Sequence, residues 1–531
     1  MKKKNIIMSV ILAGFTSVMT TSCTDWLDVK MSDNIMENTL YSTNDGFLIA
    51  LNGIYVGLND IYGRNLSVSI IDVMAQYYNV TENNDHVYKI YAGYKFKEDA
   101  FEQTSSGIWT KMYENIANIN TLLDHCDEAN SALRQSHYPL VKGEALALRA
   151  MLHFDLLRIY GPVPQDATAS QTCIPYQETS AKDIQPLLPA SEVIEKVIRD
   201  LEAAAAILKE GDPIITKGVQ NAVPSDDGLD RYDFAYRQLR LNYYAVQALL
   251  ARAYLWKGDK AKAAQIAKNE ILDKITTAEL DVFPWITEEA IQDAKKPDRL
   301  FSTEVFFSLY DQARSSMYSS LFNSSLEQRS RLTFVGEGLA SADSKIATFY
   351  DDATNDWRVT TMWDVVTVVD NSKPEGEEGD EDEGEEGKEE TTKTKSSLYS
   401  KKYMDADREA KFDGSETYRY MTPLIRLSEI YLILAECART DDEAIGYINK
   451  IREHRNCKSI TTQDGDRQTL VTKEFAREVL GEGQLFFYYK RLGMESIISG
   501  TSATEPYKML LGNYMWPLPK VEIDKRGTVK L

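Results

Sequence analysis

The hydrophobic residues of this chain recur mostly at the spacing of α-helices. Residues 108–124 and 191–208 carry apolar side chains along one face, which is typical of helices that cover a core. Residues 143–160 are apolar almost all the way round, so we expect this helix to be buried among other helices. Two longer stretches, 241–272 and 427–455, have the pattern of helix–turn–helix hairpins. Because such hairpins stack side by side, we predict a mostly α, tetratricopeptide-like α-solenoid scaffold.

The segments between these helices have a different composition. Residues 62–100 and 276–425 are rich in aromatic and polar residues and contain only short strand-like runs. We therefore expect long, loop-rich insertions with few short strands, and binding residues often lie on such loops. No Pro-, Gly- or Ser-rich linker divides the body, so we distinguish only an N-terminal helical region, 51–275, and a C-terminal region with ligand loops, 276–531.

The most apolar of the predicted helices also carries charges. Glu144, Arg149, Asp155 and Arg158 lie within it, and it ends abruptly at Gly161. Asp155 and Arg158 are three residues apart, so they can pair on one helix face. Because a buried charge needs a partner, we expect these four side chains to tie the helix to its neighbours.

This helix resembles the signature helix of the SusD/RagB-like family of outer-membrane nutrient-binding lipoproteins. The resemblance rests on the same four charged residues and Gly161, and it continues at Arg426 and Glu429 in the later stretch 424–436. Leu485 and Tyr488 depart from the family pattern, in which an arginine and an aspartate are usual. We therefore expect one family salt bridge to be absent here.

The N-terminus has the features of a lipoprotein signal. Three lysines, residues 2–4, precede an apolar run, residues 6–15, that is too short to span a membrane as a helix. Cys23 follows a small residue, so we predict a signal peptide over 1–22, a lipidated Cys23 and a lipid-proximal tether over 23–50. The alternative is an ordinary cleaved signal with a coincidental cysteine.

The charge distribution narrows the choice of partners. The net charge is −21 and no basic stripe is present, which argues against nucleic acid. Residues 375–390 hold many acids and a single lysine, and we expect the surrounding segment 371–396 to be an acidic disordered loop. Loose collection of calcium is the alternative, although the run lacks the spacing of a defined calcium loop.

The sequence contains no nucleophile elbow, phosphate loop or cofactor fingerprint, so we predict that the protein is not an enzyme and needs no cofactor. The histidines and the four later cysteines have no ligand spacing, so we expect no metal site. The sequence leaves open whether those cysteines form disulfides; they are Cys126, Cys173, Cys437 and Cys457.

Aromatic residues are the main resource for binding, since the chain has 30 tyrosines and 7 tryptophans. Sugar rings stack on aromatic faces, while their hydroxyls bond to polar side chains. Two segments combine both kinds of residue, 77–94 and a later loop around Tyr310. The predicted ligand-binding residues are Tyr77, Tyr78, Asn83, Asp85, Tyr88, Tyr91, Tyr318 and Phe322. The alternative is that most of these rings only cover the helices.

The family resemblance implies a lipid-anchored, cell-surface protein of the outer membrane. Such a protein would capture a nutrient, with an oligosaccharide or glycan as the favoured ligand, and deliver it to a TonB-dependent, SusC-like outer-membrane transporter barrel. Membrane contact would be made through the lipid alone. The alternatives are a peptide-binding member of the same family, an interaction scaffold that binds no small ligand, and a surface hydrolase.

Overall fold

The computed structural model describes most of the chain beyond the N-terminal segment. The described residues are 36–81, 83–181, 183–220, 234–336, 338–339, 344–369, 394–405 and 417–527. The predicted signal peptide, Cys23, the first part of the tether and most of the acidic segment 371–396 therefore lie outside the described residues. Helix α3 begins at Asn44, so the last residues of the predicted tether already belong to the helical body.

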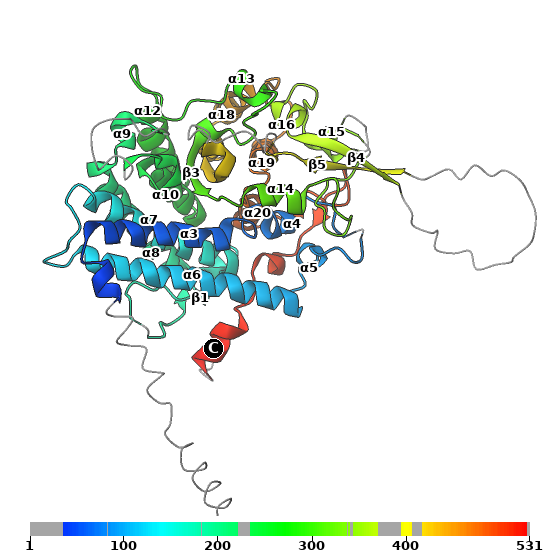
Figure 1. The fold of residues 1–531 in the computed structure, drawn as a ribbon. Coiled ribbons are helices and arrows are strands. Elements are labelled where there is room, and N and C mark those ends of the chain that lie inside the picture. The colour runs from blue at the N-terminus through cyan, green and yellow to red at the C-terminus, as the bar shows by residue number, and fades with distance from the viewer. Residues whose placement is uncertain are drawn as a thin grey trace, which may run out of the picture.

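Long helices form most of this body (Figure 1). They are α3 (Asn44–Tyr62), α6 (Asp99–Cys126), α7 (Tyr138–Tyr160), α8 (Ala190–Gly211), α10 (Tyr243–Lys257), α17 (Leu427–Cys437), α18 (Asp441–Glu453), α19 (Arg467–Glu478) and α20 (Leu485–Leu492). Shorter helices are α4 (Ile70–Met74), α5 (Lys89–Ala92), α9 (Ile214–Lys217), α11 (Lys260–Gln265), α12 (Asp273–Ile275), α13 (Glu288–Gln292), α14 (Ser315–Leu321), α15 (Lys345–Phe349), α16 (Trp357–Thr360) and α21 (Lys520–Arg526).

The strands of the described chain are short and form only two-stranded antiparallel sheets. The pairs are β1 (Thr172–Ile174) with β2 (Leu188–Pro189), β3 (Val305–Tyr310) with β6 (Met421–Arg426), β4 (Trp363–Val369) with β5 (Thr394–Ser400), and β7 (Ser496–Ile497) with β8 (Tyr507–Lys508). The β4–β5 pair extends away from the helical body in Figure 1. The predicted fold class, mostly α with few short strands, is confirmed.

Helix α7 lies at the centre of the N-terminal half. It packs against α6 and α8, and α6 in turn packs against α3. Its residues are buried on every side, as its nearly uniform apolar pattern predicts. A side chain at Gly143 would collide with Leu208 of α8, because a Cβ at this position would lie 2.6 Å from the Leu208 Cγ. The absence of a side chain there allows the two helices to approach closely.

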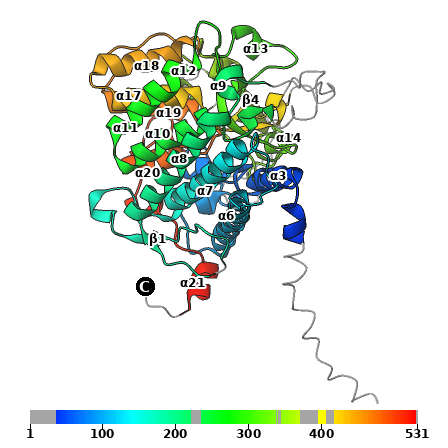
Figure 2. The same ribbon diagram turned by 90° about the vertical axis from the view of Figure 1, so that its left-hand side faces the viewer.

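The two predicted hairpins form and lie side by side. After α10 the chain turns at Gly258, whose φ of +91° is a conformation that glycine adopts without steric cost. It then continues through α11 into a π-helix, η5 (Ile266–Leu272). The second hairpin joins α17 to α18, which begins where the Thr440 hydroxyl accepts a hydrogen bond from the Glu443 N–H. Helix α17 packs against both α10 and α11 (Figure 2).

The charges on α7 have the partners that their burial requires. Glu144 pairs with Arg237 at 2.6 Å, and Arg149 pairs with Asp200 at 2.7 Å. Asp155 pairs with Arg158 on the same helix. These contacts tie α7 to the segment before α10 and to α8. The predicted structural role of the motif is consistent with this geometry.

Candidate ligand-binding site

The tyrosines predicted to form a binding surface lie mostly in the interior. Tyr77 and Tyr78 are 0% and 2% exposed. The Tyr77 hydroxyl donates to the Ala476 carbonyl at 2.5 Å, and the Tyr78 ring packs 5.8 Å from the Phe322 ring. In this conformation these rings belong to the hydrophobic core, so they offer no face to a ligand. They illustrate the alternative interpretation, in which tyrosines cover the scaffold.

The remaining predicted rings are also largely covered. Tyr88, Tyr91 and Tyr318 are each less than a tenth exposed. The Tyr88 hydroxyl accepts from Arg64, and the Tyr91 hydroxyl hydrogen-bonds to that of Thr104. The exposed part of the predicted surface is its polar edge, where Asn83 Oδ1 accepts from the Asp85 N–H at 2.9 Å.

The structure nevertheless brings the first predicted segment beside the part of the chain that follows the second. The Val87 N–H donates to the Arg329 carbonyl at 3.0 Å, and a nitrogen of the His86 ring lies 3.2 Å from the Arg331 carbonyl. The polar edge at Asn83 and Asp85 therefore adjoins the loop that follows α14.

An open cleft with an accessible aromatic ring lies at the end of β3. Tyr310 is the last residue of that strand and is 38% exposed, whereas the preceding strand residues are buried. Its ring lies 5.2 Å from that of Tyr420, and its carbonyl accepts from Asn59 on α3 at 3.0 Å. These contacts fix the strand end against α3 and leave the Tyr310 ring facing solvent.

The cleft, which we call the Tyr310 cleft, has a volume of about 420 Å³. This lies in the range of small-ligand pockets, roughly 300–1,000 Å³. It is lined by Asn52, Tyr55, Val56, Ala235, Tyr236, Leu239, Arg240, Leu309, Tyr310 and Thr417. Aromatic rings, an amide, a guanidinium and a hydroxyl thus share one concave surface.

Backbone geometry and one cation shape the wall of the Tyr310 cleft. Tyr236 has a φ of +53°, which is uncommon for a residue with a side chain, and its N–H donates to the Gln220 carbonyl at 2.8 Å. The Arg240 guanidinium lies 4.5 Å above the centre of the Tyr55 ring and donates to Asn52. Burial raises the pKa of the Tyr55 hydroxyl, so this group stays protonated and polar rather than charged.

A second groove of about 410 Å³ runs beside α19 and residues 496–506. Serine and threonine hydroxyls line much of it, but its aromatic members, Phe349 and Tyr489, are buried. It offers no accessible ring for stacking, so the Tyr310 cleft is the stronger candidate for a sugar ligand.

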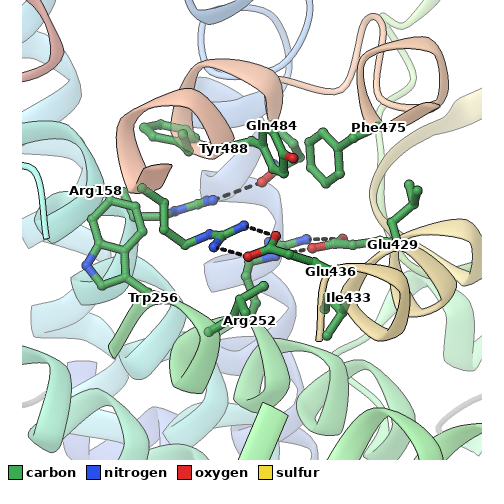
Figure 3. A pocket seen from close by; sticks show the side chains of 13 residues that line it. Arg158, Arg252, Trp256, Glu429, Ile433, Glu436, Phe475, Gln484 and Tyr488 are labelled. Atoms are coloured by element: carbon green, nitrogen blue, oxygen red, sulfur yellow. Dashed lines mark hydrogen bonds and ion pairs between the residues drawn. The ribbon is translucent and has the colours of Figure 1, made fainter. Parts of the chain in front are cut away.

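A third pocket, inside the helical body, contains family-motif residues (Figure 3). Arg252 binds Glu429 through two hydrogen bonds of 2.7 and 2.6 Å, and Arg158 donates to Gln484 at 2.9 Å. The volume is about 40 Å³, which suits a few water molecules. These contacts join α7, α10, α17 and α20, so the pocket is an internal connection between helices.

The departure of Leu485 and Tyr488 from the family pattern has a local explanation. Leu485 is fully buried, and the Tyr488 ring stacks on Phe475 with centroids 4.4 Å apart. The Tyr488 hydroxyl accepts from Gln468 at 2.8 Å. Leu485 and Tyr488 therefore make apolar and stacking contacts at the two positions where the family pattern has an arginine and an aspartate.

The fold and the cleft define a helical-repeat protein with a concave, partly aromatic surface on its insertions. Two family models match the chain: one described as "Starch-binding associating with outer membrane" over residues 25–223, and one described as "SusD family" over residues 308–530. The chain belongs to the SusD family. Members of this family bind their ligands and are not enzymes, in agreement with the prediction.

Solved structures show the same fold at low sequence identity. A SusD superfamily protein of Bacteroides thetaiotaomicron is 20% identical, with a TM-score of 0.62, over 91% of this chain and 98% of that one. A SusD-like carbohydrate binding protein of Bacteroides vulgatus is 17% identical, with a TM-score of 0.60, over 91% and 96%. Surface glycan-binding protein A of Bacteroides fluxus is 18% identical, with a TM-score of 0.58, over 92% and 98%. No curated protein sequence matches significantly.

Sequence reasoning missed most of the Tyr310 cleft. Tyr310 belongs to a segment that was predicted to bind ligand, but Asn52, Tyr236 and Arg240 were not singled out. Asn52 lies within a helical pattern, and nothing in the sequence marks it as facing a cleft. The signal that could have drawn attention to the others is the aromatic and basic composition of residues 231–240.

Proposed function

We propose that this protein captures a glycan at the cell surface and passes it to a TonB-dependent outer-membrane transporter. The single observation that carries the proposal is the Tyr310 cleft, in which an exposed ring lies beside amide, guanidinium and hydroxyl groups. A sugar ring would stack on Tyr310, while Asn52 and Arg240 would bond to its hydroxyls. No bond of the ligand is broken in this role.

One further feature supports a surface location. One family model carries the description of association with the outer membrane. Within the described residues, none of the helices combines the length and apolar character needed to cross a bilayer. We propose that the mature chain is held by lipid on Cys23, and that residues 23–43 connect this lipid to α3. Several acyl chains on one cysteine anchor a protein firmly, whereas one holds it only marginally.

The polar edge at Asn83 and Asp85, beside the loop that follows α14, remains a second proposed contact region. The half-buried Asn83 amide can donate and accept hydrogen bonds, and the exposed Asp85 carboxylate can accept them from hydroxyls, while the tyrosines behind support the loop from the interior. We propose that it extends the binding surface for a longer oligosaccharide.

Calorimetric titration of the lipid-free mature chain with a panel of glycans and mixed peptides tests this function. We expect saturable binding of at least one glycan, and a Tyr310→Ala variant that binds about tenfold more weakly, or roughly 1.4 kcal/mol. Asn83→Ala and Asp85→Ala, measured in parallel, report on the polar edge.

Tyr447→Ala, a half-buried tyrosine on α18, is the matched control and should bind as the parent does. Binding of peptides alone would favour the peptide-binding alternative. No binding across the panel, or full affinity in Tyr310→Ala, would contradict capture at the Tyr310 cleft.

A further inference from the structure

A small hollow beside the turn η7 (Thr417–Tyr420) gathers positive charge in a strongly acidic protein. The chain has a net charge of −21, yet this hollow is lined by the basic side chains of Lys295, Lys296, Arg299, Arg314, Lys402 and Arg419. We call it the basic hollow. Asp405 is the one acidic residue among its described lining residues.

Arg314 is the deepest cation of the basic hollow and is only 3% exposed. Its Nε donates to the Arg419 carbonyl, and its guanidinium lies 5.9 Å from the centre of the Tyr403 ring. Among the described residues, no carboxylate comes within 4.0 Å of Arg314, and its two terminal nitrogens have no acceptor. A buried guanidinium with free N–H groups therefore faces the hollow.

Arg299, which is half-buried, likewise has no carboxylate partner among the described residues. Its Nε donates to the Thr361 carbonyl at 2.9 Å and its Nη1 to the Met404 carbonyl at 3.4 Å, so its described acceptors are neutral. Burial lowers the pKa of both Arg299 and Arg314, which reports the cost of desolvating their charge.

Other basic side chains of the molecule bind carboxylates, which Arg299 and Arg314 lack among the described residues. Arg237, which is equally buried, binds Glu144 and Asp212. Within the basic hollow, Lys402 binds Glu482 at 2.6 Å and Arg419 binds Asp405 at 2.7 Å. Buried charges in proteins are normally paired, so the buried Arg314, with the half-buried Arg299 beside it in the hollow, is placed to bind an anion from outside.

We propose that the basic hollow binds an oxyanion, namely a sulfate, phosphate or carboxylate group, held by Arg314 and Arg299. Guanidinium groups bind such oxygens through paired, charge-assisted hydrogen bonds. The enclosed volume of about 20 Å³ exceeds what one water needs, about 10–15 Å³, but is far smaller than a sugar ring. Only the oxygens of the group enter, and any larger molecule lies outside.

The oxyanion has two sources, a free inorganic ion or a charged substituent on a larger ligand. The turn η7 borders both sites, because Thr417 lines the Tyr310 cleft while Tyr418 and Arg419 line the basic hollow. The basic hollow is nevertheless a separate site, and binding of inorganic anions there does not depend on glycan capture.

Thermal melting and calorimetry of the lipid-free mature chain test the proposal, with sodium sulfate and sodium phosphate compared to sodium chloride at equal ionic strength. We expect a saturable rise in Tm and a saturable heat with the oxyanions only. Arg314→Gln should weaken the apparent affinity about tenfold, because it removes the charge-assisted bonds. Lys97→Gln, at an exposed lysine that does not line the basic hollow, should leave the affinity unchanged.

Arg314→Gln could fail to fold, so two milder variants accompany it. Arg314→Lys keeps the charge but loses the planar fork, and Lys295→Gln changes only the exposed rim; both should weaken binding. Equal responses to chloride and the oxyanions, or an unchanged affinity in a folded Arg314→Gln protein, would overturn the proposal.

Binding of charged oligosaccharides distinguishes the two sources of the oxyanion, a free inorganic ion and a charged substituent on a larger ligand. If the group belongs to a larger ligand, Arg314→Gln should weaken binding of a sulfated or uronate-containing oligosaccharide and leave its neutral counterpart unaffected. If inorganic ions respond but charged and neutral oligosaccharides behave alike, the source is a free anion. Either result supports the site, whereas a loss of neutral and charged binding together would indicate general disruption and contradict it.

Discussion

At the scale of single residues, the most consequential groups are the paired charges in the C-terminal half. Glu474 is fully buried and binds Arg358 at 2.7 Å, Arg477 at 3.0 Å and Arg452 at 3.3 Å. Burial alone would raise the pKa of the Glu474 carboxyl, but the three guanidinium groups outweigh it and lower this pKa to about 2. Glu478, which binds Arg455 and Arg426, has its pKa lowered in the same way.

This shift predicts a loss of stability in acid. The folded-state pKa of Glu474 lies below its usual value of 4.5, so its contribution is present above about pH 4.5 and is lost as the pH falls towards 2. Glu474→Gln should cost about 3–5 kcal/mol at pH 7, because it removes a buried carboxylate that three guanidinium groups share and leaves an excess of buried positive charge.

Urea unfolding of both proteins between pH 7 and pH 3 measures the effect, and the gap between them should narrow as the pH falls. Glu453→Gln, an exposed residue on α18, is the control. A gap that stays constant over this range would contradict the assignment.

The sequence could predict that the charges of α7 are paired but not which tyrosines are exposed. The first prediction follows from local rules, since a charge on an apolar helix must be neutralised. The exposure of Tyr77 or Tyr310 depends on how distant segments pack. Tyr77 is covered by Phe334 and Phe349 from other parts of the chain, while Tyr310 lies at a strand end and is 38% exposed.

At the scale of elements, helix periodicity predicted the scaffold well. The stretches expected as helices correspond to α6, α7 and α8, and both hairpins form. The pairing of β3 with β6 could not be predicted, because its strands are far apart in the sequence and each is short. The π-helix η5 was likewise not evident, since its apolar spacing resembles that of an α-helix.

The close approach of α7 and α8 gives a prediction at this scale. Gly143→Ala places a Cβ 2.6 Å from Leu208, and the resulting strain should lower the free energy of unfolding by about 1–3 kcal/mol. Gly446→Ala on α18 is the matched control, because a Cβ there meets nothing within 4 Å. It should be neutral or stabilise by up to about 1 kcal/mol through helix propensity. Thermal or urea unfolding of both variants measures these effects. Equal effects of the two changes would contradict the close packing of α7 against α8 at Gly143.

At the scale of the whole molecule, a helical scaffold supports separate surfaces on its insertions. The hairpins α10–α11 and α17–α18 pack together, and the ion pairs Arg252–Glu429 and Arg491–Glu436 connect α17 to α10 and to α20 (Figures 2 and 3). The polar edge at Asn83 and the basic hollow lie on the segments between the long helices, and the Tyr310 cleft lies between such segments and α3. A family resemblance of the helices could therefore predict the class of protein, while the ligand depends on the less regular segments.

Hydrogen exchange with and without a bound glycan tests the central claim most directly, because it locates the ligand on the intact protein. The Tyr310 cleft is bordered by residues 235–240 and 417–420, and the alternative surface is bordered by residues 83–91 and 324–332. Capture at the cleft predicts slower exchange in the first pair of segments, with any protection of the second pair confined to longer oligosaccharides. Protection of the second pair alone would contradict the cleft as the site of capture.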